Sequence, residues 1–140
     1  MKLIPHFTFD GCAEEALNFY AKVFKGEVIC AIHFEDFQAE MPEVVNEENK
    51  HRLMYSTLAI GKDCLIAMCD NCPKEEAHKE SNIFMDVSYA DVKELKRVYE
   101  DLSAGGEVLM PLGKTPWSEN FASVVDKFGI GWNLMEEDKQ

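Results

Sequence analysis

Two cysteines with a spacing suited to metal or redox chemistry stand in the segment CDNC, at Cys69 and Cys72, and His78 follows shortly after. Cysteines separated by two residues can bind zinc or form a redox-active disulfide. A structural zinc site usually needs a second ligand pair, and a thioredoxin-like pair opens a helix, whereas Pro73 and a polar segment follow this pair. We therefore interpret the segment as the end of a strand that enters a loop, and we leave its role open.

Hydrogen-bonding side chains also alternate with apolar ones in a run near the N-terminus. Alternation is typical of a strand, because successive side chains point to opposite faces of a sheet. His6 and Thr8 therefore share one face, and Phe7 and Phe9 share the other. We expect the two phenylalanines to pack against a helix and the two polar side chains to face a binding site.

The same alternation gives further candidates for ligand binding. Tyr55 and Thr57 share one face of a later strand, where the Tyr55 phenol is a hydrogen-bond donor above an apolar floor. Trp117 and Phe121 can stack on a flat ligand. Filling of the core is the alternative for Trp117 and Phe121, and it is the commoner role of such side chains.

The stretch FASVVDKFGIGWNLMEE near the C-terminus joins two apolar runs by a hairpin. Asp126 can accept backbone hydrogen bonds there and Gly129 can supply a positive φ, so we assign both residues to the turn. Asn133 interrupts the apolar pair Trp132 and Leu134 at an inward-facing position. Because a buried amide is costly without partners, we expect Asn133 to contact a ligand.

The elements that must position these side chains occur twice in the same order. In the first half, periodicity predicts a strand, a helix and three strands over residues 4–9, 13–24, 27–34, 52–60 and 64–69. In the second half it predicts the same order over residues 82–88, 91–102, 107–110, 121–126 and 131–136. Asp91 is placed as the N-cap of the second helix. The chain therefore contains an internal repeat.

The repeat predicts an α+β fold of two βαβββ modules, residues 1–70 and 82–140, joined by a linker over residues 71–81 within one structural domain. In each module the helix covers one face of the sheet and leaves the other face bare. Because bare apolar faces must meet or enclose something, we expect a curled mixed sheet around a cleft.

The composition excludes several classes of partner. The chain has 140 residues, 14 basic and 26 acidic, and its formal net charge of -12 repels nucleic acid and anionic membranes. It has no apolar stretch of about 18 residues that would span a membrane and no signal peptide pattern. The five cysteines are irregularly spaced and do not suggest a disulfide framework. We therefore expect a cytoplasmic protein.

Residues 35–48 form a strongly acidic segment without clear periodicity, which predicts a loop. Such a loop can close over the cleft as a lid, act as a solvated connector, or dock a basic partner. The charge run alone favours the solvated connector.

Two segments carry a resemblance to a known family, GCAEEALNFYAKVFKGEV in the first half and MPLGKTPWSENFASVVDKFGIGW in the second. Nearly end to end, the chain resembles the vicinal oxygen chelate superfamily, which includes glyoxalase I, extradiol dioxygenases and the bleomycin and fosfomycin resistance proteins. It is most similar to the PhnB-like branch, labelled demethylubiquinone methyltransferase-like. The sequence has no glycine-rich loop between a strand and a helix followed by an acidic ribose partner, so it does not itself indicate an adenosyl cofactor.

The resemblance implies a divalent metal in the cleft, held by histidine and glutamate side chains. The corresponding positions in this chain are His6, Ala67, Asn82 and Asn133. One imidazole and two neutral amides lack the charge to hold zinc, iron or nickel tightly, so we expect no metal cofactor. The resemblance also implies a homodimer.

We therefore predict a homodimeric protein that binds a small organic molecule in a metal-free cleft. The residues predicted to line this cleft are His6, Thr8, Tyr55, Thr57, Asn82, Trp117, Phe121 and Asn133. One alternative is a metal-dependent lyase or dioxygenase of the same superfamily, and another is a protein-interaction domain that uses the acidic loop 35–48. No catalytic residue is assigned.

Overall fold

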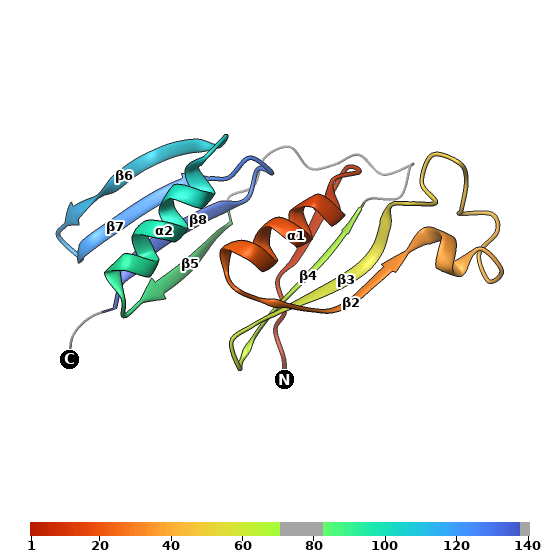
Figure 1. The fold of residues 1–140 in the computed structure, drawn as a ribbon, viewed down its shortest axis with the longest axis horizontal. Coiled ribbons are helices and arrows are strands. Elements are labelled where there is room, and N and C mark those ends of the chain that lie inside the picture. The colour runs from red at the N-terminus through yellow and green to blue at the C-terminus, as the bar shows by residue number, and fades with distance from the viewer. Residues whose placement is uncertain (71–82, 138–140) are drawn as a thin grey trace. The chain divides into compact units, whose positions relative to one another are not determined.

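The computed structural model divides into two compact units, Met1–Lys79 and Glu80–Gln140 (Figure 1). Each unit contains a four-stranded sheet and an α-helix in the order strand, helix, strand, strand, strand. The predicted α+β class and the repeat of βαβββ modules are therefore confirmed.

The structure describes residues 1–70 and 83–137. Some of the sequence predictions fall outside these residues. They are the linker over residues 71–81 and the positions of Cys72, His78 and Asn82.

The first unit is a mixed sheet with the strand order β1, β4, β3 and β2. The strands are β1 (His6–Phe9), β2 (Glu27–His33), β3 (Leu53–Ile60) and β4 (Cys64–Asp70). β1 runs parallel to β4, whereas β4 with β3 and β3 with β2 are antiparallel. The helix α1 (Ala13–Val23) packs on one face of this sheet, against β2, β3 and β4 (Figure 1).

The helix α1 forms because its apolar residues recur at helical spacing and share one face. The buried residues of this face are Ala13, Ala16, Leu17, Tyr20 and Val23. Glu14 and Glu15 in the first turn and Lys22 in the last turn have the signs that the helix dipole favours.

A buried carboxylate fixes the start of α1 to the end of β4. Asp70 is 4% exposed, and its Oδ1 accepts from the backbone N–H groups of Gly11 at 2.7 Å and Ala13 at 3.0 Å. Its Oδ2 accepts from the backbone N–H of Leu53 at 3.1 Å. A buried carboxylate is tolerated where such donors satisfy it, so Asp70 ties three elements together.

The acidic loop 35–48 is anchored to the first unit. It begins in a short 3-10 helix, η1 (Phe34–Phe37). Val45 and Asn49 are buried, and Asn49 donates from Nδ2 to the carbonyl of Val44 at 2.8 Å. The loop therefore carries apolar and hydrogen-bonded contacts of its own, which its charge pattern did not indicate.

The second unit has the strand order β5, β8, β7 and β6. Its elements are β5 (Phe84–Tyr89), α2 (Val92–Ser103), β6 (Glu107–Thr115), β7 (Ser118–Val125) and β8 (Gly131–Glu136). As predicted, Asp91 caps α2, since its carboxylate accepts from the backbone N–H of Lys93 at 2.9 Å. No helix in the described part of the chain has the length and apolar character needed to cross a membrane.

The hairpin between β6 and β7 is longer than the sequence predicts. β6 was expected to end at Met110 and β7 to begin at Phe121, but the strands continue to Thr115 and from Ser118. The Thr115 hydroxyl accepts from the backbone N–H of Ser118 at 3.1 Å and closes the turn. Shifts in the β6–β7 register accommodate Pro111, a residue that usually argues against a strand.

Candidate functional site

One face of the first sheet carries most of the polar candidates. The ring of Phe7 lies 6.1 Å from the ring of Tyr20 on α1, so Phe7 faces the helix and its neighbours His6 and Thr8 face away. Strand register places further side chains on this same face. We call the set the open face of the first sheet; it comprises His6, Thr8, Cys30, Tyr55, Thr57, Ala67 and Cys69.

The imidazole of His6 lies at the centre of the polar contacts on this face. Its Nε2 is 3.1 Å from the Sγ of Cys69 on the neighbouring strand. The ring centroids of His6 and Tyr55 are 6.2 Å apart at an angle of 56°. The hydroxyl of Thr8 is 3.8 Å from the same cysteine sulfur. An imidazole, a phenol, a thiol and a hydroxyl therefore converge from three strands.

Thr57 has a similar contact with a cysteine. Its hydroxyl lies 3.6 Å from the Sγ of Cys30, the residue opposite it on β2. Ala67 lies opposite Thr57 on the other side, and it is 3% exposed, so it gives this part of the face an apolar floor. Tyr55 remains 38% exposed, which leaves its ring available to a ligand.

The structure thus brings His6, Thr8, Tyr55 and Thr57 together on one surface and adds Cys69 to them. The sequence analysis missed Cys69 as a site residue because the CDNC segment was interpreted as the end of a strand. The sequence nevertheless contained a signal for Cys69. Cys69 is two residues after Ala67 in an apolar run, so alternation places both side chains on one face of the strand.

The amide of Asn133 lies on the corresponding face of the second sheet. Its Oδ1 accepts from the hydroxyl of Ser123 at 2.8 Å, and its Nδ2 donates to Oδ1 of Asp86 at 2.9 Å. All three residues lie opposite one another in the register of β5, β8 and β7. The Asn133 amide therefore has hydrogen-bond partners within the protein. The second hydrogen of its Nδ2 and the second oxygen of Asp86 can still bond a ligand.

Trp117 and Phe121 contact each other. Their ring centroids are 5.4 Å apart and their planes are almost perpendicular, at 82°. Phe121, on β7, is 8% exposed, whereas Trp117 is 58% exposed. The core-filling role therefore suits Phe121, and the indole of Trp117 is left accessible.

Asp126 and Gly129 belong to the hairpin turn, as predicted. Asp126 Oδ1 accepts from the backbone N–H groups of Phe128 at 2.9 Å and Ile130 at 3.1 Å, and Gly129 has a φ of 87°. Oδ2 also accepts from the indole Nε1 of Trp132 at 2.8 Å, a contact that links the turn to the core. Asp126 therefore has a structural role, since it stabilises the turn and its contact with Trp132.

The positions at which the resemblance implies metal ligands do not fit a divalent transition metal. In the first unit, the register partner of His6 is Ala67, which has no donor atom, and in the second unit the Asn133 amide already bonds two protein groups. Within residues 1–70 and 83–137 no group of three or more histidine, cysteine, aspartate or glutamate side chains is arranged to hold a metal ion. We therefore derive no chemical step through a metal.

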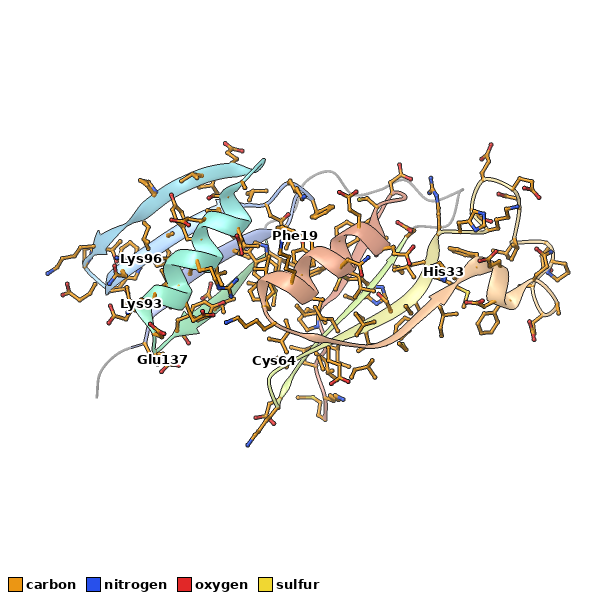
Figure 2. The ribbon with its side chains drawn as sticks, viewed as in Figure 1. Phe19, His33, Cys64, Lys93, Lys96 and Glu137 are labelled. Atoms are coloured by element: carbon orange, nitrogen blue, oxygen red, sulfur yellow. The ribbon has the colours of Figure 1, made fainter. Side chains whose placement is uncertain are left out.

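The thiol of Cys12, also in the first unit, lies in an environment that disfavours its ionisation. Cys12 is the N-cap residue of α1 and lies beside the buried carboxylate of Asp70. Burial raises the pKa of the Cys12 thiol, and the negative charge of Asp70 raises it further. Cys64 differs, because it is exposed at the start of β4 (Figure 2).

Nearly the whole chain matches a known protein family. A family model described as 3-demethylubiquinone-9 3-methyltransferase matches residues 1–135. Protein YjdN from Escherichia coli (strain K12) is 28% identical over 145 residues, which cover 96% of this chain and 94% of that protein.

Solved structures share the fold. A Bacillus cereus structure described as a putative 3-demethylubiquinone-9 3-methyltransferase, PhnB protein, has a TM-score of 0.82 at 23% identity, covering 98% of this chain and 100% of that one. A member of the glyoxalase/bleomycin resistance protein/dioxygenase superfamily from Sphaerobacter thermophilus has a TM-score of 0.59 at 18% identity, with 98% of each chain covered. At these identities the similarity concerns the fold.

Proposed function

Because the chain belongs to the family described as 3-demethylubiquinone-9 3-methyltransferase and has the fold of the glyoxalase/bleomycin resistance/dioxygenase superfamily, we propose that it binds a small, flat organic molecule on the open face of its first sheet. This membership agrees with the PhnB-like resemblance of the sequence. Since a fold hosts many functions, the proposal rests on the chemistry of the face.

One observation carries the proposal, namely the convergence of His6 and Tyr55 on the face opposite α1. Their rings provide a surface on which a flat molecule can stack, and each ring also has a hydrogen-bonding group. Ile32, which is half-buried, can supply apolar contact beside Tyr55, because it is the register partner of Tyr55. Neutral polar groups around an apolar floor are typical of sites for small organic ligands.

The second sheet supplies further candidates for the same function. The Asn133 amide and the Asp86 carboxylate keep hydrogen-bonding capacity beyond the bond they share. The exposed indole of Trp117 can stack on an aromatic ring. Asn82 stays a prediction from the sequence.

The donor geometry gives no support to methyl transfer from an adenosyl cofactor. In folds that bind such cofactors, the backbone N–H groups at a strand-to-helix junction usually meet the ligand. Here the N–H groups of Gly11 and Ala13 at that junction donate to Asp70, and Asp91 caps the second helix. We therefore assign binding and no transfer step.

We further propose a cytoplasmic homodimer that associates through edge strands. β2 is one of the two edge strands of the first sheet and β6 is one of the two edge strands of the second, and each carries exposed apolar residues. Ile29 is 58% exposed and Leu109 is 50% exposed. Apolar side chains beside unpaired strand edges favour association with another chain.

Thermal unfolding in the presence of a library of neutral planar aromatic fragments tests the binding proposal. We expect some fragments to raise the melting temperature of the wild-type protein, because a ligand that binds only the folded state stabilises it. Tyr55→Ala should abolish the shift. A variant of the acidic loop with Glu43, Glu47 and Glu48 changed to glutamine should keep it. Loss of the shift in the loop variant alone would contradict the proposal and favour the interaction-domain alternative.

A further inference from the structure

The sulfur of Cys69 and the imidazole of His6 are within hydrogen-bonding distance, at 3.1 Å between Sγ and Nε2. The two side chains come from adjacent parallel strands, where His6 pairs with Ala67 and Thr8 pairs with Cys69. A cysteine beside an imidazole is the arrangement of an activated nucleophile, because the ring can take the thiol proton. The contact joins residues 63 positions apart, so the fold builds this pair.

Neighbouring side chains contact both His6 and Cys69. The ring of Tyr55 packs beside the imidazole, with centroids 6.2 Å apart. The Thr8 hydroxyl lies 3.8 Å from the cysteine sulfur, where it can donate to a thiolate. Asp70 follows Cys69 directly but points to the other face, where three backbone N–H groups donate to it. Its carboxylate therefore lies away from the sulfur.

Among the described residues, further titratable groups on this face come from the strands β3 and β2. Tyr55 is on β3, and Cys30 is on β2 with its sulfur 3.6 Å from the Thr57 hydroxyl. Glu27 pairs with Ala59, at the far end of the β2–β3 ladder from Tyr55. Unlike these groups, the His6 ring lies within hydrogen-bonding distance of the Cys69 sulfur, at 3.1 Å.

We propose that Cys69 and His6 form a nucleophile–base pair that captures small electrophiles with a carbon–carbon double bond conjugated to a carbonyl group. His6 takes the thiol proton on Nε2, in the tautomer that carries hydrogen on Nδ1. The Cys69 thiolate then attacks the β-carbon, a sulfur–carbon bond forms, and the π pair moves to the carbonyl oxygen as an enolate. The imidazolium returns the proton to the α-carbon. The product is a thioether, and no oxidant or reductant is required.

This reaction goes beyond the proposed binding function, which concerns reversible association. Reversible binding of fragments that lack a reactive double bond would survive the failure of this proposal. Conversely, Cys69 can react with a small probe even if no fragment binds the face. The fragment-binding experiment and the cysteine-modification experiment can therefore fail independently of each other.

N-ethylmaleimide, which contains such a conjugated double bond, is the probe for the test. The fully reduced full-length chain is treated with the probe at about pH 6.5, where an ordinary thiol with a pKa near 8.5 is almost entirely protonated. The rate of modification is then measured for each cysteine by peptide mass spectrometry. Cys64 and Cys12 are the internal controls, because one is exposed and the other has a raised pKa.

We expect Cys69 to react about tenfold faster than Cys64, and His6→Gln to remove that advantage while leaving the Cys64 rate unchanged. His6 is exposed, so the substitution should preserve the fold, and circular dichroism checks this. His6→Asn serves as a second variant. A Cys69 rate no higher than that of Cys64, or one that both His6 variants leave unchanged, would overturn the proposal.

Discussion

Asn133 donates from Nδ2 to Oδ1 of Asp86 at 2.9 Å, across the parallel pair of β8 and β5. Its Oδ1 accepts at the same time from Ser123 on β7, so one amide links three neighbouring strands. The amide is half-buried, and Asp86 is exposed. Asn133 therefore stabilises a polar ladder on a face that water can still reach.

Asn133→Leu should lower the free energy of unfolding by about 1 kcal/mol, the typical net value of a hydrogen bond. The loss stays small because the Asp86 carboxylate regains water when its partner is removed. Urea denaturation measures the change. In a double-mutant cycle with Asp86→Ala the two effects should be non-additive. Strict additivity would show that the bond makes no contribution.

Cys12 should be the slowest of the described cysteines to react with iodoacetamide at about pH 8. Burial and the charge of Asp70 raise its pKa, so the folded protein keeps this thiol protonated at pH values where an ordinary thiol ionises. The rate should increase only above the ordinary thiol range. Because the raised pKa disfavours ionisation in the folded state, Cys12 should also reduce stability at high pH. A Cys12 rate equal to that of Cys64 at about pH 8 would contradict this assignment.

Dialysis against dilute zinc, nickel or manganese should leave far less than stoichiometric metal in the protein. Of the positions at which the resemblance implies metal ligands, Ala67 has no donor atom and Asn133 is a neutral amide, so these positions lack donors and charge. Elemental analysis measures the metal content. Stoichiometric binding that disappears in His6→Ala would contradict the prediction and support a metal-dependent enzyme.

The protein should be a dimer in solution, with a light-scattering mass twice the chain mass of 16.0 kDa. Ile29→Lys and Leu109→Lys should shift the equilibrium toward monomer, because each puts a charge on an edge strand. Ile83→Lys is the control outside β2 and β6, because Ile83 is also exposed but lies just before β5. A monomeric mass for the wild-type chain at micromolar concentration would count against the dimer.

Local patterns in the sequence were sufficient for much of the fold. The helical spacing of α1, the Asp91 cap and the turn at Asp126 are encoded within a few residues of each other, and all three are confirmed. Alternation placed His6 opposite Phe7 for the same reason. The β6–β7 hairpin was predicted too short. Proline and glycine within β6 interrupt the alternation that predicts a strand, whereas in the structure shifts in register let the strand continue past them.

The contacts of the site depend on pairing between distant segments. Cys69 contacts His6 only because β1 and β4 pair in parallel with a particular register, and no local pattern specifies that register. Asn133 meets Asp86 and Ser123 for the same reason. Alternation could therefore predict which residues share a face of a sheet, but not which of them contact one another.

The central claim is that a small flat molecule binds the open face of the first sheet, and NMR chemical shift mapping of labelled protein with planar aromatic fragments tests it most directly. We predict that the shift changes concentrate at His6, Thr8, Tyr55, Thr57 and Cys69. Changes confined to the acidic loop 35–48, or the lack of any fragment that perturbs the open face at millimolar concentration, would contradict the claim.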